Sequence, residues 1–321
     1  GFIGSHLVER LIAAGLQVNV LDDLSSGRLG NLTTVADRIT LFTGDVADPV
    51  AVEQAMRGCQ AVVHLAAVAS VEASVREPLR TNRTNLVGTI TVLEAAAMAG
   101  ARRVVYASSA AVYGEADELP IAEDAAKRPM SPYAVDKLAG EHYLAHYHRQ
   151  GRLDGTAFRF FNVYGPRQDP GSPYSGVISV FLERVARGAG VTIHGDGRQT
   201  RDFVYVADVV EAVHKVLTAT PPAAVLEPDA ATPSDLAVMN LGRGASTDLL
   251  SLLADVAAVC GREGQLEVRH DARREGDIAH SRADIARLRS RFDWVPSTSL
   301  RGGLEATLAT GQASLSTSRR D

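Results

Sequence analysis

Tyr133 and Lys137 are the pair of residues with the clearest chemical potential in this sequence of 321 residues. They lie four positions apart in a segment that begins Ser131-Pro132, a start typical of a helix, so the two side chains share one helical face. An ammonium group beside a phenol stabilises the phenolate, and lowering a tyrosine pKa from about 10 to about 7 takes about 4 kcal/mol. The resulting phenolate is a general base near neutral pH. The alternative is a surface tyrosine near a surface lysine.

Ser109 is the third candidate for this chemistry. It follows a predicted strand over residues 104–107 and precedes the helix that carries Tyr133 and Lys137. Ligands of open α/β sheets bind beyond the carboxyl ends of the strands. A serine at this place can hydrogen-bond the substrate hydroxyl whose proton passes to the tyrosine. The small residues around Ser109 leave room for a cofactor.

The first residues of the chain have the pattern of a dinucleotide-binding turn. Gly1 and Gly4 precede an amphipathic helix that ends near Gly15, and a short apolar strand follows and ends at Asp22. Asp22 lies 18 positions after Gly4, close to the ~20 expected between phosphate-binding glycines and a ribose-binding acid. A strand should precede such a turn. We therefore expect that the sequence begins inside the motif and that the first strand is missing.

Apolar strands alternate with helical patterns through the first half of the chain. Strands are predicted at residues 18–21, 39–42, 61–65, 104–107 and 156–161, and helices at 86–99 and 131–150 and after Asp48-Pro49. This alternation predicts an α/β fold with a Rossmann-like doubly wound parallel sheet. A smaller mixed α/β region for substrate binding follows, where elements become shorter.

The domain boundaries follow from the same change of pattern. We expect a dinucleotide-binding domain over residues 1–165, rejoined by a strand near 238–241, and a substrate-binding region over 166–310. Residues 220–233, rich in Pro and Ala, are expected to form a surface loop. Residues 311–321 are polar and are expected to be a disordered tail.

Composition excludes several classes of partner. The net charge of −5 and the pI near 6.0 argue against nucleic acid. No run reaches the ~18 apolar residues needed to span a membrane. Cys59 and Cys260 cannot form a disulfide framework, which favours the cytoplasm. His142 and His146 share a helical face but lack a third ligand nearby, so we expect no metal site.

The sequence resembles the extended short-chain dehydrogenase/reductase superfamily and, within it, the NAD-dependent nucleotide-sugar epimerases. The segments that carry the resemblance occur in the family's order over nearly the whole chain. They are GFIGSHLVERL, VLDDLSSG, GDVAD, HLAA, TNLVGTITVLEAA, YASSAAVYG, SPYAVDK, FRFFNVYGPRQDP, GDGRQTRDFVYVADV and RREGD.

The resemblance implies NAD as the cofactor and assigns residues to it. Gly1 and Gly4 belong to the turn that binds the pyrophosphate, and Asp22 binds the adenosine ribose. Asp45 and Val46 flank the adenine, Leu65, Ala66 and Ala67 pass along the cofactor backbone, and Tyr133 and Lys137 contact its nicotinamide side. An acid at the ribose position repels a 2′-phosphate and so favours NAD over NADP. Ser109, Tyr133 and Lys137 are implied to be the catalytic set, in which Lys137 and the positively charged oxidised nicotinamide together lower the pKa of Tyr133.

The resemblance also implies a UDP-sugar substrate. Asn162, Arg201 and Arg274 correspond to residues that contact the diphosphate, for which arginine is well suited because its rigid fork binds phosphate oxygens in pairs. Asp277 corresponds to the residue that binds the uridine ribose. Ser281 is small at a position that governs access of an N-acetyl group.

The residues after Ser109 favour one reaction within the family. The family's 4,6-dehydratases carry an Asp-Glu pair there and its decarboxylases carry a Glu, whereas this chain has Ala110-Ala111. Neither alanine is an acid or base, so we expect 4-epimerisation of a UDP-hexose by transient oxidation at sugar carbon 4. UDP-glucuronate epimerase, dehydratase or reductase activity and a non-catalytic NAD-binding protein remain alternatives. The resemblance also implies a homodimer.

Overall fold

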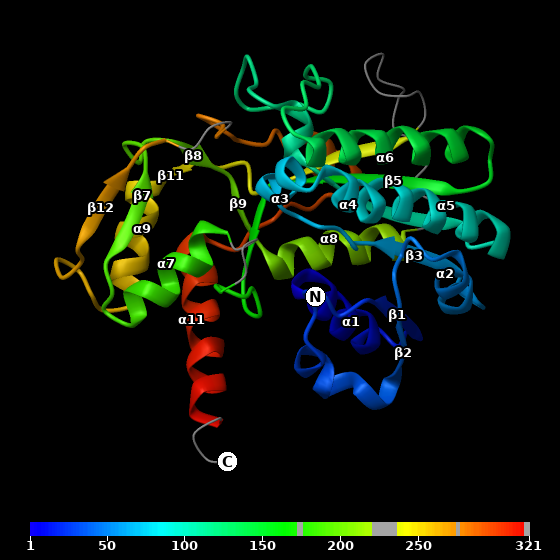
Figure 1. Ribbon diagram of the computed structural model, residues 1–321, viewed down its shortest axis with the longest axis horizontal. Coiled ribbons are helices and arrows are strands. Elements are labelled where there is room, and N and C mark those ends of the chain that lie inside the picture. Colours follow the sequence, from blue (N-terminus) through cyan, green and yellow to red (C-terminus); the bar gives the residue numbers. More distant parts are fainter. Residues whose placement is uncertain (172–175, 220–235, 274–276, 318–321) are drawn as a thin grey trace.

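The described residues form a four-stranded parallel sheet and four two-stranded sheets, with helices packed around them, as seen from one side in Figure 1. The computed structural model describes residues 1–171, 176–219, 236–273 and 277–317. Helices and parallel strands alternate along the chain, so the predicted α/β class with a parallel sheet is confirmed. The predicted loop at 220–233 lies outside the described residues.

The larger sheet has four strands in the order β10 (Ala237–Leu241), β5 (Asp154–Phe160), β4 (Arg103–Ser109) and β3 (Ala61–His64). Every neighbouring pair is parallel. The strands β4, β5 and β10 are buried nearly throughout, which explains their continuous apolar runs. The strand β10 pairs with β5 although about eighty residues separate them, so the chain returns to this sheet as the sequence predicts.

The second sheet contains only β1 (Val18–Asp22) and β2 (Ile39–Thr43), which are also parallel. No described strand joins β1 to β3. Packing of α1 on α8 and of α2 on α5 contributes to holding β1 and β2 beside the larger sheet.

Helices pack on both faces of the larger sheet. On one face lie α2 (Pro49–Met56), α5 (Gly88–Ala99) and α6 (Pro132–Arg149), and on the other lie α1 (Phe2–Ala13) and α8 (Val206–Thr218). Alternate residues of each strand divide between the two cores, as a strand geometry requires. The doubly wound arrangement predicted from the sequence is thus present among the described residues.

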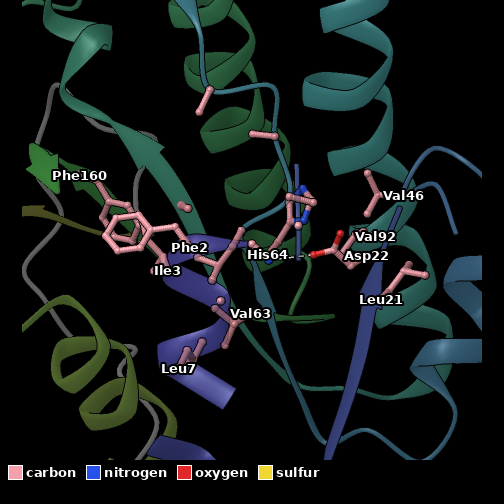
Figure 2. Close-up of a pocket in the computed structure, with 18 of the residues that line it drawn as sticks. Phe2, Ile3, Leu7, Leu21, Asp22, Val46, Val63, His64, Val92 and Phe160 are labelled. Carbon is pink, nitrogen blue, oxygen red and sulfur yellow. Dashed lines mark hydrogen bonds and ion pairs between the residues drawn. The ribbon is translucent and has the colours of Figure 1, made fainter. Parts of the chain in front are cut away.

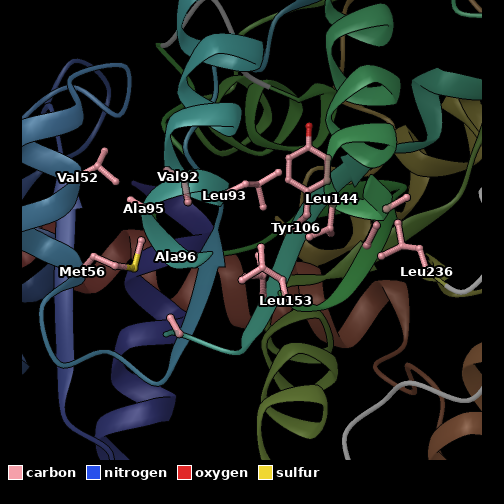
Figure 3. Close-up of a cluster of buried hydrophobic side chains, with 14 of the residues drawn as sticks. Val52, Met56, Val92, Leu93, Ala95, Ala96, Tyr106, Leu144, Leu153 and Leu236 are labelled. Atoms are coloured by element: carbon pink, nitrogen blue, oxygen red, sulfur yellow. The ribbon is translucent and has the colours of Figure 1, made fainter. Parts of the chain in front are cut away.

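The core beneath α5 and α6 is shown in Figure 3. Leu93 of α5, Leu144 of α6 and Tyr106 of β4 meet there, each no more than 1% exposed. On the opposite face of the sheet Phe158 and Met239, both fully buried, pack toward α1 and α8. These two cores fix α6 on the sheet and so fix the side chains that α6 carries.

Local signals in the sequence set the ends of the helices. The Asp48 carboxylate accepts a hydrogen bond from the backbone N–H of Val50 at 3.0 Å and caps α2. The hydroxyl of Ser131 caps α6 by accepting from the N–H of Ala134 at 3.2 Å. Gly100, with a φ of 73°, ends α5 in the left-handed conformation that favours glycine.

A smaller mixed region lies beside the larger sheet. It contains α7 (Val177–Ala186), β7 (Val191–His194), α9 (Leu249–Val259) and β12 (Val268–Asp271), with β12 parallel to β7. Its own apolar core joins these elements to the first turns of α11 (Leu300–Thr317). The boundaries at residues 165 and 310 remain predictions.

The end of the chain differs from its predicted disorder. Helix α11 continues to Thr317, although the composition of residues 311–317 predicts an unstructured tail. Leu300 and Leu304 anchor the first turns of the helix in the core, and a nucleated helix extends by one backbone hydrogen bond for each added residue. Residues 318–321 lie outside the described residues.

The helix predicted to start at residue 86 begins earlier in the structure. The helices α4 (Pro78–Asn82), η2 (Arg83–Val87) and α5 follow one another without a break. No helix in the described part of the chain is long and apolar enough to cross a membrane. The remaining elements are η1 (Leu29–Arg38), α3 (Val71–Arg76), α4 (Pro78–Asn82), η2 (Arg83–Val87), η3 (Ala110–Tyr113), β6 (Asn162–Tyr164), β8 (Thr200–Arg201), β9 (Phe203–Tyr205), β11 (Thr247–Asp248) and α10 (Ala286–Phe292).

Candidate active site

A cavity of about 2670 Å³ opens at the carboxyl ends of β1, β3 and β4 and continues between β1 and β3. In Figure 2, Leu21 and Asp22 of β1 lie across this cavity from Phe160 of β5, with Phe2 and Ile3 at the start of α1 between them. Most of the predicted site residues line this one cavity. They are Gly1, Gly4, Asp22, Val46, Leu65, Ala66, Ala67, Ser109, Tyr133, Lys137, Asn162, Arg201, Asp277 and Ser281.

Two of the predicted residues do not join this set. Asp45 is absent from the wall of the cavity. Its carboxylate accepts a hydrogen bond from the N–H of Ala47 at 2.8 Å and lies 3.3 Å from Arg83. Arg274 lies outside the described residues.

Tyr133, Lys137 and Ser109 lie together at the junction of α6 and β4. The Nζ atom of Lys137 lies 5.9 Å from the centre of the Tyr133 ring and donates a hydrogen bond to the carbonyl oxygen of Ala107 at 2.8 Å. The Tyr133 phenol is hydrogen-bonded to the Ser109 side chain. The spacing of four on α6 thus places both functional groups against the end of β4.

Burial sets the protonation of this pair. It lowers the pKa of Lys137 from 10.5 to about 8, with the Asp136 carboxylate opposing it, so the ammonium group stays charged at neutral pH. Burial raises the pKa of Tyr133, and the hydrogen bond with Ser109 only partly offsets this. Loss of water around the phenol therefore dominates its pKa in the protein alone. The lowered pKa expected from the sequence involves Lys137 together with a positively charged nicotinamide, and it stays a prediction.

A segment after β3 forms the floor beneath the nicotinamide side of the predicted site. His64 is 4% exposed, bonds the Thr89 hydroxyl at 3.0 Å and stacks on Tyr106. Burial lowers the pKa of His64 to about 3, so its ring is neutral. The buried Asn85 side chain accepts from the N–H of Val68 at 2.8 Å and donates to the Val68 carbonyl at 3.3 Å. These contacts fix residues 65–67, which line the cavity.

Asp22 and the glycine turn meet at the other end of the cavity. The Asp22 carboxylate accepts hydrogen bonds from the Gly1 amino group at 3.1 Å and from the N–H of Leu24 at 2.8 Å. A Cβ at Gly27 would lie 2.8 Å from an Asp22 oxygen, so only glycine allows the loop to approach this closely. The N-terminus of α1 opens into the same space, where its backbone dipole favours an anionic group.

The segment 166–169 closes one side of the cavity and was not singled out from the sequence. Arg167 donates to the Glu9 carboxylate of α1 at 2.7 Å and to the Ser5 hydroxyl at 3.3 Å. The Pro166 carbonyl lies 2.9 Å from Nε2 of His6. In the sequence, these residues belong to the motif GPRQDP, which could have indicated the segment, but its polar residues were given no role. The segment ties the helix that follows the glycine turn to the substrate-binding region.

Arg201 and Asp277 form an ion pair on the substrate side of the cavity. Arg201 also donates to the Thr200 carbonyl at 2.8 Å. Asn162 is exposed at the start of β6, and Ser281 is 7% exposed in the same wall. The predicted diphosphate and ribose residues thus come together, although the sequence separates Arg201 from Asp277 by 76 positions.

Residues 1–171, 176–219, 236–273 and 277–317 contain no group of three His, Cys, Asp or Glu side chains that could hold a metal ion. In that part of the chain, the ring of His146 lies against the amide of Gln150, and the Nδ1 atom of His148 accepts from the N–H of Gly155.

Comparison with known proteins matches this geometry. The family model described as the NAD dependent epimerase/dehydratase family matches residues 1–226. The UDP-glucose 4-epimerase of Mycolicibacterium smegmatis is 38% identical over 312 residues, which are 96% of this chain and 95% of that protein.

Two solved structures are similar over almost their whole length. The UDP-glucose 4-epimerase of Thermotoga maritima, solved with UDP-glucose, has a TM-score of 0.89 and 35% identity, covering 98% of this chain and 97% of that chain. The UDP-N-acetylglucosamine 4-epimerase of Methanobrevibacter ruminantium, solved with UDP-N-acetylmuramic acid, has a TM-score of 0.87 and 35% identity, covering 98% and 96%. The chain belongs to the NAD-dependent epimerase/dehydratase family.

Proposed function

We propose that the protein catalyses the NAD-dependent 4-epimerisation of a UDP-hexose. The observation that carries this proposal is the meeting of Tyr133, Lys137 and Ser109 at one wall of the cavity, beside Ala110 and Ala111. Two alanines stand where dehydratases and decarboxylases of the family carry acids. The chain therefore has the groups for the oxidation step shared by the family and lacks those for elimination or loss of carbon dioxide.

The residues around the cavity fit NAD. The acid Asp22 ends β1 and suits two ribose hydroxyls, while the α1 N-terminus suits a pyrophosphate. The apolar Val46 and the floor at residues 65–67 suit the flat rings. Bound in this place, NAD would supply the acceptor for the hydride of sugar carbon 4 and the donor that returns it to the other face. The reaction is redox-neutral overall.

The protein's own side chains handle the proton. Tyr133, as the phenolate, takes the proton of the sugar 4-hydroxyl. Ser109 is hydrogen-bonded to the Tyr133 phenol, which places its hydroxyl where it can also bind and orient the sugar hydroxyl. The charged Lys137 stabilises the phenolate. Burial raises the pKa of Tyr133 in the protein alone, so the positive charge of the oxidised nicotinamide ring is needed as well. The phenol returns the proton to the oxygen on carbon 4 after the 4-keto sugar has rotated to present its other face.

Arg201 and Asp277 support a UDP group as the handle of the substrate. An arginine fork binds two phosphate oxygens, and a carboxylate accepts from ribose hydroxyls. The ion pair between them keeps both near Asn162 on the same wall of the cavity. Arg274 is assigned to the diphosphate by resemblance alone. The nucleotide is held while the sugar is free to rotate.

Ser281 supports acceptance of N-acetylated sugars. Its side chain is small and buried in the wall on the sugar side. A small residue there leaves space for an acetamido group at sugar carbon 2. We therefore propose that UDP-GlcNAc and UDP-GalNAc are substrates beside UDP-glucose and UDP-galactose. The solved UDP-N-acetylglucosamine 4-epimerase that is similar to this chain favours the same view.

Turnover of UDP-galactose to UDP-glucose with no net change of nicotinamide absorbance tests the proposal. A stoichiometric change of that absorbance would instead indicate a reductase or dehydrogenase. Release of carbon dioxide from UDP-glucuronate, or formation of a 4-keto-6-deoxy sugar, would indicate a decarboxylase or a dehydratase. Binding of NAD with no turnover of any UDP-sugar would indicate a non-catalytic protein.

We infer that the protein acts as a homodimer. Val87 of η2 and two residues of α6, Val135 and Tyr143, are 43%, 50% and 41% exposed on helices that pack against each other. An apolar face on adjacent helices suits a second copy of the same chain. The free thiols of Cys59 and Cys260 support a cytoplasmic location. Light scattering of the purified protein gives the oligomeric state.

A further inference from the structure

Helix α6 makes a third contact with the end of β4, beyond those of Tyr133 and Lys137. Glu141 lies one helical turn after Lys137, on the same face, and accepts a hydrogen bond from the Ser108 hydroxyl. Lys137 bonds the Ala107 carbonyl, and Tyr133 bonds Ser109. Three consecutive residues at the end of β4 are therefore tied to three α6 side chains at a spacing of four.

Arg159 of β5 holds Glu141 in this position. Its Nε and Nη2 atoms donate to the two Glu141 carboxylate oxygens at 2.9 and 2.7 Å, and both side chains are 1% exposed. Arg159 lies directly beside Ser108 in the parallel pairing of β4 and β5. A buried ion pair is strongly destabilised when one partner is removed, so the two charges require each other.

The rest of the guanidinium group is also satisfied. Its Nη1 atom donates to the Tyr113 hydroxyl at 2.9 Å and to the Glu123 carbonyl at 2.7 Å. Tyr113 in turn donates to the Asn240 side chain of β10 at 2.6 Å, and the N–H of Asn240 donates to the Glu123 carboxylate at 2.8 Å. One fully buried polar network therefore joins α6 to β4, β5 and β10.

Glu141 and Arg159 do not line the cavity, so neither touches a substrate or cofactor there. Their role must act through the position of other groups. The positions of the Tyr133 phenol and the Lys137 ammonium relative to Ser109 and Ala107 of β4 depend on where α6 sits along β4. Both residues share their helical face with Glu141. A displacement of about 1 Å at a reacting group lowers a rate by about 100-fold.

We propose that Glu141 is a positioning residue for the reaction, held by Arg159 and Ser108, and that it sets the place of Tyr133 and Lys137 relative to Ser109. This inference rests on the proposed function. It predicts a defect in the chemical step and in the titration of the Tyr133 phenol, and no defect in binding. Removal of the contact shifts α6 relative to β4 and weakens the hydrogen bond between Ser109 and the phenol. Because that hydrogen bond lowers the pKa of the phenol, its weakening raises this pKa.

The test uses Glu141→Gln, which removes the charge and keeps the shape, and Ser108→Ala, which removes one donor. We expect kcat to fall about 10- to 100-fold in each with KM within about two-fold. The titration of Tyr133 in the NAD-bound protein is followed by tyrosinate absorbance, as the difference from the same protein carrying Tyr133→Phe. It should move up by about half a pH unit or more.

A matched control is Ser74→Ala, a serine that is also buried but donates only to the Val71 carbonyl within α3. It should leave kcat and the titration unchanged. Because Glu141→Gln leaves Arg159 unpaired, the double variant Glu141→Met with Arg159→Met is a second measurement, since an apolar pair often replaces a buried ion pair without loss of stability. It should fold as stably as the wild type and still show the low kcat and the shifted titration.

Titration curves and kcat values like the wild type in Glu141→Gln or in the folded double variant would overturn the inference. So would a loss of activity that follows only the unfolded fraction, with the phenol titrating as in the wild type. A wild-type protein without epimerase activity is the separate failure of the proposed function. The phenol titration tests the positioning role in that case too, because it requires no turnover.

Discussion

The Lys137 ammonium donates a 2.8 Å hydrogen bond to the backbone carbonyl of Ala107 and lies 5.9 Å from the centre of the Tyr133 ring. This contact ties the charge to the backbone at the end of β4. The charge stabilises the phenolate form of Tyr133.

Replacement Tyr133→Phe should lower kcat by about 10²- to 10⁴-fold, because the general base is removed. NAD affinity should stay within about two-fold, since the ring that lines the cavity is kept. Rates are measured with UDP-galactose, and NAD binding by calorimetry. Tyr147→Phe on the same helix is the control and should keep full activity. Equal rates for Tyr133→Phe and the wild type would contradict the assignment of the base.

The pH dependence of stability should report the buried Lys137. Burial lowers the pKa of its ammonium to about 8, against 10.5 when exposed. Between these two pH values the unfolded chain binds a proton that the folded chain does not, so stability rises with pH across this window. The full rise is about 3 kcal/mol. Urea unfolding of the wild type and of Lys137→Met, at pH 7 and at pH 10.5, measures it.

The difference in unfolding free energy between these two proteins isolates the lysine, because all other groups titrate in both. We expect the wild type to gain about 3 kcal/mol relative to Lys137→Met on going from pH 7 to pH 10.5. A constant difference between the two proteins over this range would show that Lys137 keeps the pKa of an exposed lysine.

Sequence patterns predicted the elements better than the contacts between them. The cap at Ser131 and the left-handed Gly100 act within one turn of the chain, so local sequence sets the ends of α6 and α5. The pairing of Glu141 with Arg159 depends on the register of β5 beside β4 and on the packing of α6, which no local pattern encodes. The face shared by Glu141 with Tyr133 was readable, but its partner was not.

The protonation of the site was also beyond the sequence. The spacing of Tyr133 and Lys137 indicated an ammonium beside a phenol, and this is what the structure contains. The effect of desolvation depends on how deeply both groups lie among residues from β4 and α6. In the protein alone, burial raises the pKa of Tyr133, a contribution that no sequence pattern encodes.

Replacement Arg167→Ala should weaken NAD binding about five-fold, because it frees the helix that follows the glycine turn from segment 166–169. The ion pair with Glu9 is partly exposed, so about 1 kcal/mol is expected. Arg10→Ala is the matched control. Arg10 belongs to α1 and forms an ion pair with Glu211 of α8 at 3.1 Å. This ion pair also involves α1, but it lies against α8 and not at the cavity. Equal NAD affinities of the two variants would contradict the role of Arg167.

Replacement Ser281→Tyr should lower turnover of UDP-GalNAc by about 10-fold or more, because the larger side chain fills the space for the acetamido group. Turnover of UDP-galactose should change by no more than about three-fold. Both rates are measured on the same preparation, whose melting temperature shows whether the wall has been disturbed. A parallel loss for both sugars would indicate general damage to the site.

Replacement Gly140→Ala should destabilise the protein by about 1–3 kcal/mol through overpacking. A Cβ at Gly140 would collide with the Tyr106 hydroxyl, where α6 approaches β4 most closely. Tyr106→Phe removes the nearest of the colliding atoms, so the double variant should recover part of the lost stability. Urea unfolding of the single and double variants measures this, and strictly additive losses would contradict the collision.

The separation of β1 and β2 from the larger sheet has a consequence for how the molecule opens. Among the described residues these strands share no ladder of backbone hydrogen bonds with the larger sheet, so their amides should exchange with solvent before those of β4 and β5. Asp22 belongs to β1 and is therefore part of the unit that is expected to open first. Cofactor capture and closure of this N-terminal unit are then a single linked equilibrium, and a dinucleotide in excess acts on it as a folding ligand.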